Sequence, residues 1–171
     1  ALGFTSNCCS NTSRGVAYAD GTVFLATLDA KMIAIDAETG KKKWEVWSVE
    51  PEDNKKGNYG YNSAPVAIGN MVVIGTTGGE AQTRHHLTAF DQKTGKQVWR
   101  TDLEIILSAG PGVDGDRVVV AGYDGELILL NATDGSEIWR VDIIGESLAK
   151  PVISSDLVIV YTNDGRLRAY S

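Results

Sequence analysis

The sequence predicts an all-β fold, a β-propeller built from repeated four-stranded blades. Three observations predict it. A similar eleven-residue segment occurs at 34–44, 89–99 and 129–139, and each copy ends in tryptophan. Each copy follows short runs rich in β-branched residues and bracketed by Asp and Gly, which are typical of strands. The period is roughly forty to fifty residues, the length of one propeller blade.

The repeat divides the chain as one propeller unit into consecutive blades. The predicted parts are a closing strand at 1–7, a first blade at 8–49, a loop at 50–61, a second blade at 62–103, a third blade at 104–143 and an incomplete fourth blade at 144–171. Glycine closes the turn before each outermost strand, at Gly40, Gly95 and Gly135. Trp44, Trp99 and Trp139 recur in those strands, and we expect their rings to fill gaps between neighbouring blades.

The runs Val118–Val120 and Val158–Val160 are too short for buried helices. We expect them to be inner strands that are buried on both faces.

The fourth blade lacks its outermost strand, because 165–171 aligns with 30–36 of the first blade. An unpaired sheet edge would be exposed there, and residues 1–7 are free to cover it in the same chain or in a neighbour. One alternative is a closed ring of four blades. The other, which we favour, is a head-to-tail homodimer of eight blades, in which the first strand of each chain completes the last blade of the other.

Composition excludes several classes of protein. A chain of 171 residues with 43% hydrophobic and 22% charged residues can bury one core without disulfides. The net charge of -6 disfavours nucleic acid as a partner, and the basic triplet Lys41–Lys43 lies beside a turn as a solvated face. We expect neither a membrane span nor a signal peptide, because no run of eighteen apolar residues and no basic flank with an apolar core occurs.

The two cysteines of the chain are adjacent, Cys8 and Cys9, and Ser13-Arg14-Gly15-Val16 follows them. Together with the stretches 28–36 and 75–80, this motif means that residues 8–101 resemble the quinoprotein alcohol and methanol dehydrogenases. That family uses pyrroloquinoline quinone (PQQ) in an eight-bladed propeller.

The resemblance implies a set of cofactor residues. Cys8 and Cys9 would form a vicinal disulfide that lies against the PQQ plane, and Arg14 would hydrogen-bond a quinone oxygen or carboxylate. Thr77, Gly78 and Gly79 would pass close to the cofactor edge, and Glu80 would bind Ca²⁺ or a lanthanide ion. The residues alone leave other interpretations open: two reduced thiols, a simple hairpin loop and an exposed acid.

Two features depart from the dehydrogenase pattern. Asn62 stands where the family has a cofactor-contacting threonine. His85 and His86 stand where the family has small residues, and neighbours on a strand point to opposite faces and cannot easily share a metal. We expect both histidines at the surface.

Residues 107–171 instead resemble the BamB lipoproteins, non-enzymatic scaffolds of outer-membrane assembly. The remaining metal ligands and the catalytic base of a quinoprotein have no counterpart there, since Asn131, Asp134, Asp142 and Asp156 fall in turns or outer strands. No catalytic residue is therefore assigned.

These observations predict a non-catalytic propeller scaffold, chimeric or engineered, that closes into a ring with itself and needs no cofactor. One alternative is a PQQ-binding, alcohol dehydrogenase-like protein that uses PQQ and Ca²⁺. Another is a BamB-like scaffold that binds a protein partner through its loops, with 49–61 as the best candidate. Both resemblances imply a periplasmic location.

Overall fold

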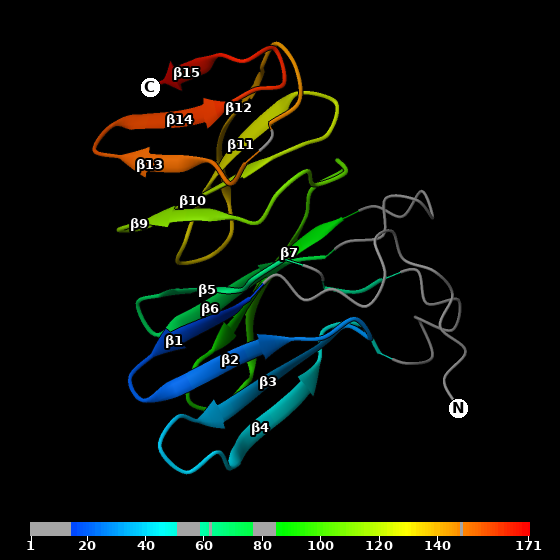
Figure 1. Cartoon of the computed structure of the whole chain (residues 1–171), viewed down its shortest axis with the longest axis vertical. Coiled ribbons are helices and arrows are strands. Elements are labelled where there is room, and N and C mark those ends of the chain that lie inside the picture. The colour runs from blue at the N-terminus through cyan, green and yellow to red at the C-terminus, as the bar shows by residue number, and fades with distance from the viewer. Residues whose placement is uncertain (1–14, 51–58, 62, 77–84, 148) are drawn as a thin grey trace.

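The computed structural model describes residues 15–50, 59–61, 63–76, 85–147 and 149–171, which form a series of antiparallel sheets (Figure 1). No helix within those ranges could span a membrane. The all-β prediction is confirmed. The first sheet comprises β1 (Val16–Ala19), β2 (Thr22–Ala26), β3 (Lys31–Asp36) and β4 (Lys42–Trp47).

The next two sheets repeat this order of four strands. The second comprises β5 (Val66–Ile68), β6 (Met71–Gly75), β7 (His86–Asp91) and β8 (Gln97–Asp102). The third comprises β9 (Gly112–Asp114), β10 (Arg117–Ala121), β11 (Glu126–Asn131) and β12 (Glu137–Asp142). In the fourth, the described strands are β13 (Val152–Ser154), β14 (Leu157–Tyr161) and β15 (Leu167–Tyr170).

The turn before each outermost strand is held by side chains from its own sequence. The Asp36 carboxylate accepts hydrogen bonds of 2.8 Å from both the backbone N–H and the hydroxyl of Thr39, and these lower its pKa to about 2. Asp91 accepts the equivalent bonds from Thr94 at 2.8 and 2.7 Å. Because an Asx turn needs only local residues, the repeated segment folds in the same way each time.

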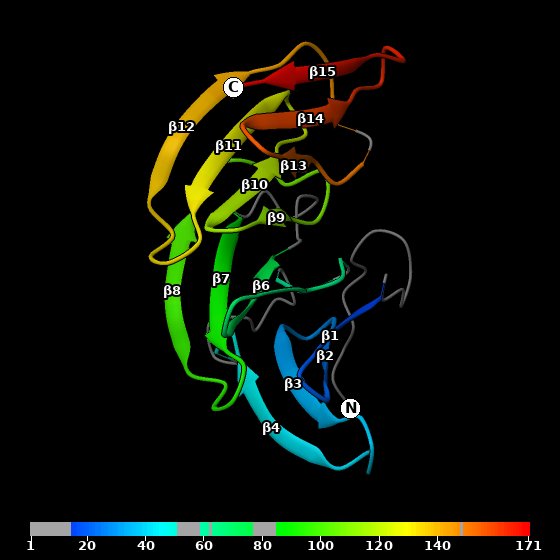
Figure 2. The ribbon, with the colours of Figure 1, turned by 90° about the vertical axis from the view of Figure 1, so that its left-hand side faces the viewer.

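The sheets stand side by side along an arc. Contacts between innermost strands run from β1 to β5, from β5 to β9 and from β9 to β13. Figure 2 looks along the axis of the arc: β4, β8 and β12 follow its outer side, and the first and fourth sheets lie at its two ends.

Apolar side chains fill the three boundaries between neighbouring sheets. The second and third sheets are therefore buried on both faces, and Val118–Val120 are fully buried as predicted. The same prediction is wrong for Val158–Val160. Val158 and Val160 are buried against the third sheet, but Ile159 points to the opposite face and is half-buried.

Candidate functional site

The residues predicted to bind PQQ and its metal, Cys8, Cys9, Arg14, Thr77, Gly78, Gly79 and Glu80, all lie outside the described residues. So do Asn62 and most of the predicted docking loop, 51–58. Their roles stay predictions. The described residues nearest to them are Thr76 and His85, which flank the stretch 77–84.

Thr76 and His86 join the two strands on either side of that stretch. The Thr76 N–H donates to the His86 carbonyl at 3.0 Å, and the His86 N–H donates to the Thr76 hydroxyl at 2.9 Å. Thr76 is completely buried, so this pair of bonds is shielded from water. The bonds hold β6 and β7 together at the ends that lead into 77–84.

The prediction that His85 and His86 lie at the surface is wrong. Their exposed fractions are 1% and 0%. The second sheet has a neighbour on both faces, so the opposite directions of the two side chains lead into two different sheet boundaries. His85 accepts a hydrogen bond from the Leu107 N–H at 2.9 Å, whereas His86 lies 3.5 Å from the hydroxyl of Ser48, which directly follows β4.

Burial keeps both imidazoles neutral. It lowers the pKa of His85 and of His86 to about 4, since a charged ring loses its hydration there. Within the described ranges, Nε2 of His85 and Nδ1 of His86 have no hydrogen-bond partner. No group of three or more His, Cys, Asp or Glu side chains suited to a metal occurs in this part of the chain either.

The acidic and amide residues considered as further metal ligands have other roles. Asn131 accepts a hydrogen bond from the Thr133 N–H at 2.8 Å, and Asp134 accepts two from Ser136 at 2.9 and 2.6 Å. Asp142 and Asp156 are exposed. The described residues therefore do not fit the metal that accompanies PQQ, and any such site depends on the predicted residues outside them.

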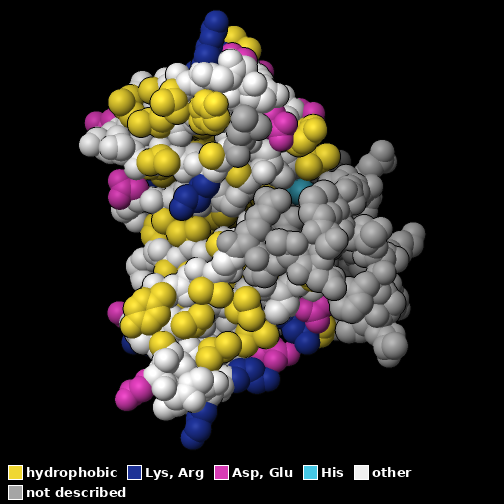
Figure 3. Space-filling view, viewed as in Figure 1, with side chains coloured by type: hydrophobic (Ala, Val, Ile, Leu, Met, Phe, Trp, Pro, Cys, Tyr) yellow, Lys and Arg dark blue, Asp and Glu magenta, His cyan; other side chains and the backbone are white. Residues whose placement is uncertain are grey.

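One groove of about 520 Å³ lies on the concave side of the arc, lined by the inner strands β1 and β5 and by the segments that lead into β5, β9 and β13. The lining residues come from the start of each sheet: 16–18, 63–67, 108–110 and 149–150. Lys150 is the one charged residue in this described lining. Figure 3 views this side, on which apolar side chains gather over β1 and over β13 and β14.

The two end sheets each carry an apolar face that no described sheet covers. We call the first the sheet 1 end face; cross-strand pairing places Val16, Tyr18, Val23, Leu25, Ile33 and Ile35 on it. The sheet 4 end face consists of Val152, Leu157, Ile159, Tyr161, Leu167 and Ala169. Tyr18 is 66% exposed and Leu167 is 73% exposed. These faces could not be predicted from the sequence, because strand patterns indicate burial without identifying the covering element.

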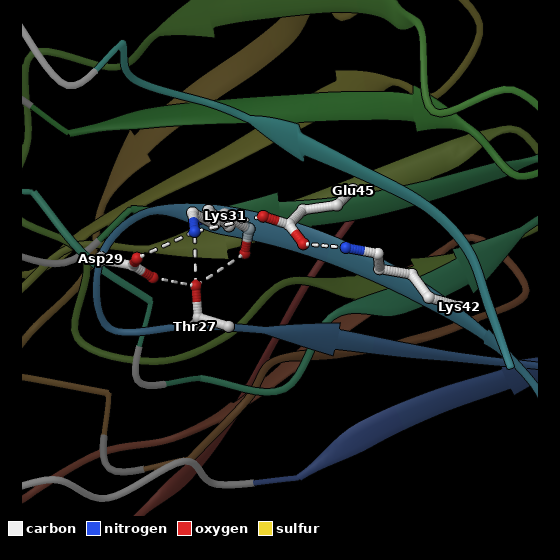
Figure 4. Close-up of polar contacts among 5 residues, drawn as sticks. All are labelled: Thr27, Asp29, Lys31, Lys42 and Glu45. Atoms are coloured by element: carbon white, nitrogen blue, oxygen red, sulfur yellow. Dashed lines mark hydrogen bonds and ion pairs between the residues drawn. The ribbon is translucent and has the colours of Figure 1, made fainter. Parts of the chain in front are cut away.

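The charges beside the sheet 1 end face are paired with one another (Figure 4). Lys31 lies 3.5 Å from Asp29 and 3.1 Å from Glu45, and Glu45 also pairs with Lys42 at 2.7 Å. The Lys31 ammonium additionally stands 4.2 Å from the ring centre of Trp47. Covering this face would leave no lone charge among these groups.

Comparison with known proteins identifies the fold family. The family model of the glucose/ethanol/alcohol dehydrogenase β-propeller domain matches residues 6–105, and that of outer membrane protein assembly factor BamB matches residues 83–171. Each spans more than half of the chain. The chain belongs to the PQQ-type β-propeller proteins. Both predicted resemblances are confirmed.

Curated relatives of this PQQ-type propeller match about half of it. It is 42% identical over 95 residues to the dehydrogenase subunit of a quinone alcohol dehydrogenase from Komagataeibacter europaeus. It is 41% identical over 92 residues to a lanthanide-dependent methanol dehydrogenase from Methylacidiphilum fumariolicum. Each match covers 54% of the chain, but only 13% and 14% of the relatives' own lengths.

Solved structures share the fold along nearly the whole propeller chain. The quinohemoprotein alcohol dehydrogenase of Pseudomonas putida HK5 matches with a TM-score of 0.78 at 20% identity, over 95% of the chain and 33% of its own length. BamB from Moraxella catarrhalis matches at 0.68 and 19%, over 91% and 48%. The computationally designed Ika4 protein matches at 0.69 and 16%, over 93% and 94%.

Proposed function

We propose that this protein is a non-catalytic β-propeller scaffold whose arc closes into a ring as a head-to-tail homodimer. The observation that supports this proposal is the pair of uncovered apolar faces at the two ends of the arc. Contiguous apolar surfaces of this kind mark sites of protein association.

The internal boundaries indicate how the end faces would pair. At each boundary, the earlier sheet contributes the face that carries its outer-strand tryptophan. The next sheet contributes its other face, the one without the tryptophan. The sheet 4 end face corresponds in position to the tryptophan-bearing faces, and the sheet 1 end face corresponds to the faces without the tryptophan. A contact between them would repeat the joint already made three times within the chain.

In the proposed homodimer, the fourth sheet of each copy would stack on the first sheet of the other. Residues 1–7, which lie outside the described residues, would add the outermost strand to β15 of the partner. Strand addition at an open edge gains backbone hydrogen bonds without requiring a particular side chain.

We also propose that the chain joins repeats of two origins, as a chimeric or engineered propeller. Support comes from the two family models, which match 6–105 and 83–171 and overlap only at 83–105, and from the designed protein of nearly equal length that shares the fold. Finding the intact reading frame among ordinary neighbouring genes of a natural genome would contradict an engineered origin.

Multi-angle light scattering at micromolar concentration tests the ring. We expect twice the 18.3 kDa of the chain. Leu157→Lys places a charge on the sheet 4 end face and should give the mass of a single chain. The matched control is Ile138→Lys, which changes a 51% exposed residue of β12 outside the end faces. A single-chain mass for the wild-type protein would contradict the proposal.

A second candidate function is the binding of PQQ together with Ca²⁺, without turnover. It is supported by the dehydrogenase family model, which covers every predicted cofactor residue from Cys8 to Glu80. Titration with PQQ and Ca²⁺ should then change the quinone absorption spectrum. Glu80→Gln should make this spectral change depend less on Ca²⁺. An unchanged spectrum would contradict this candidate.

A third candidate is a BamB-like scaffold in the periplasm, supported by the family match of residues 83–171. The predicted docking loop would provide the contact with a protein partner. A pull-down with outer-membrane assembly components, compared with a variant lacking 50–58, tests it; equal capture by both proteins would contradict a role for the loop.

A further inference from the structure

Both ends of the predicted docking loop are anchored on the hairpin between β2 and β3. Just before the loop, the Ser48 N–H donates to the Ala30 carbonyl at 2.9 Å. At the far end, the Tyr61 N–H donates to the Thr27 carbonyl at 3.1 Å. Val49 and Tyr61 also belong to the apolar cluster that fills the boundary between the first and second sheets. Both ends of the loop are therefore part of this boundary.

The His86 side chain, on the second sheet, meets both ends. Its Nε2 atom lies 3.5 Å from the Ser48 hydroxyl at the near end. Its ring centre lies 5.8 Å from that of Tyr59 at the far end, and the two planes are tilted by 47°. A separation of this size is typical of packed aromatic pairs. One imidazole thus connects both ends of the loop to β7.

The closed joint leaves polar atoms of His86 and Thr88 unpaired. Both side chains point from β7 toward the first sheet, because residues two apart on a strand share a face. Both are completely buried, and neither Nδ1 of His86 nor Oγ1 of Thr88 has a hydrogen-bond partner among the described residues. A buried polar atom without a partner costs free energy, which water would return on opening. This joint is thus held less firmly than one filled by apolar side chains alone.

Burial is the largest influence on the charge of the His86 ring, and it lowers the pKa. Three other described side chains act on it: Arg100 and His85 lower the pKa, whereas Asp102 raises it. Arg100 and Asp102 lie on β8, and cross-strand pairing places Asp102 beside His86. The loop presents the hydroxyls of its two far-end tyrosines, and burial raises the pKa of Tyr61, which therefore stays neutral.

We propose that His86 is a pH-sensitive latch: protonation of its ring frees the segment Tyr59–Tyr61 from the boundary, while the third and fourth sheets stay folded. An imidazolium ion carries a proton on both nitrogens and needs hydration, which a buried boundary does not supply. Opening brings the ring into water and breaks the bond from Tyr61 to Thr27. The latch lies within one chain, so it does not depend on the proposed ring.

The direction of the pH effect follows from the burial of His86. Its pKa is about 4 in the closed joint, whereas that of a hydrated ring is 6.5. The closed joint therefore binds a proton less readily than the open joint, and it is most stable above pH 6.5. As the pH falls from 6.5 toward 4, the ratio of open to closed joints should rise by up to about tenfold per pH unit.

Amide hydrogen exchange of the ¹⁵N-labelled full chain between pH 6.5 and 5.0 measures the opening. The Tyr61 amide reports the latch, and the amides of β10 and β11 report global unfolding, since their sheet is buried on both faces. The protection factor of Tyr61 should lie below those of β10 and β11. It should fall by up to about tenfold per pH unit, the effect of one histidine. Those of β10 and β11 should fall more steeply, because unfolding exposes both histidines.

Two variants assign the effect to one ring. His86→Gln removes the titrating group, and should make the Tyr61 protection factor independent of pH, whatever its absolute value. His86→Phe, which keeps an aromatic ring beside Tyr59, takes its place if the first variant does not fold. His85→Asn is the matched control, because His85 faces the other boundary. It should leave the pH dependence of Tyr61 unchanged and reduce that of β10 and β11.

The possible outcomes are distinct. Equal protection of Tyr61, β10 and β11 would show that the joint opens only with the whole chain, and would overturn the latch. A pH dependence of Tyr61 that persists without His86, or that disappears in His85→Asn, would belong to another group and also overturn it. Lower protection of Tyr61, with a pH dependence that requires His86 alone, would support the latch whatever the mass of the wild-type protein.

Discussion

The backbone N–H of Leu107 donates a hydrogen bond of 2.9 Å to Nδ1 of His85. Acceptance at Nδ1 places the imidazole proton of the neutral ring on Nε2. Protonating the ring would break this bond inside the boundary between the second and third sheets. His86 faces the other boundary, between the first and second sheets, so both joints contain a histidine that must stay neutral.

The first prediction concerns acid stability. Both histidines bind protons less readily in the folded state, with a pKa of about 4, than in the unfolded chain, where it is 6.5. The free energy of unfolding should therefore fall as pH drops below 6.5 and continue falling to about 4, by at most about 1.4 kcal/mol per pH unit for each histidine. Urea unfolding at pH 7.0, 6.0 and 5.0 measures the slope.

The chain has only these two histidines, so their replacement isolates the effect. A variant with His85→Asn and His86→Gln should show a flat stability profile between pH 6.5 and 5, whatever its absolute stability. A slope equal to that of the wild-type protein would assign the acid sensitivity to carboxylates instead.

The second prediction compares Gly95→Ala with Gly40→Ala. Their φ values differ by only 2°, from 71° to 69°, so the strain from a left-handed alanine is the same, about 1 kcal/mol. Only Gly95 adjoins a tryptophan ring. Its variant should lose about 2 kcal/mol more, the typical cost of overpacking. Equal losses in urea unfolding would show that the Trp44 ring moves aside freely.

The repeated turns could be predicted from the sequence because Asp36, Thr39 and Gly40 make their contacts within five residues. The packing role of the tryptophans was also predicted, and it is confirmed: Trp44, Trp99 and Trp139 pack at the boundaries between sheets. The hydrogen bonds that the indole N–H groups of Trp44 and Trp99 donate to the Gln92 and Ala132 carbonyls, at 2.9 and 2.7 Å, could not be predicted. Their acceptors are backbone atoms, which leave no mark on the sequence.

Burial of His85 and His86 could not be predicted because polarity argues for the surface. What buries them is the position of β7 inside a sheet that is packed on both faces, and this depends on residues far away in the chain. The predicted cofactor residues rest on resemblance alone. Cys8, Arg14 and Glu80 lie in stretches without the alternating pattern that is typical of a strand. They also lie outside the described residues.

The third prediction tests the indole hydrogen bond of Trp99. Trp99→Phe keeps an aromatic ring but removes the donor, which leaves the Ala132 carbonyl without its partner. We expect the free energy of unfolding to fall by about 1 to 2 kcal/mol. Trp99→Ala should cost about 3 to 5 kcal/mol, because it also empties the boundary. Wild-type stability in Trp99→Phe would mean that packing alone holds this joint.

The fourth prediction concerns the hairpin between β2 and β3. The Thr27 hydroxyl donates to Asp29 at 2.5 Å and accepts from the Lys31 N–H at 3.1 Å. Thr27→Val preserves the shape but removes both bonds, and should cost about 1 kcal/mol per bond at most. Thr27→Ser retains the hydroxyl and should lose less. Thermal unfolding of both variants measures the difference, and the reverse order would rule out these bonds as the cause.

The end faces differ from each other, and this gives the assembly a polarity. A joint between unlike surfaces uses one face of each molecule and leaves the other free, so it can continue indefinitely unless the curvature returns it to its start. Whether such a molecule forms a ring or a fibre depends on the rotation added at each step. A small change of tilt between sheets could thus convert a discrete particle into a growing filament.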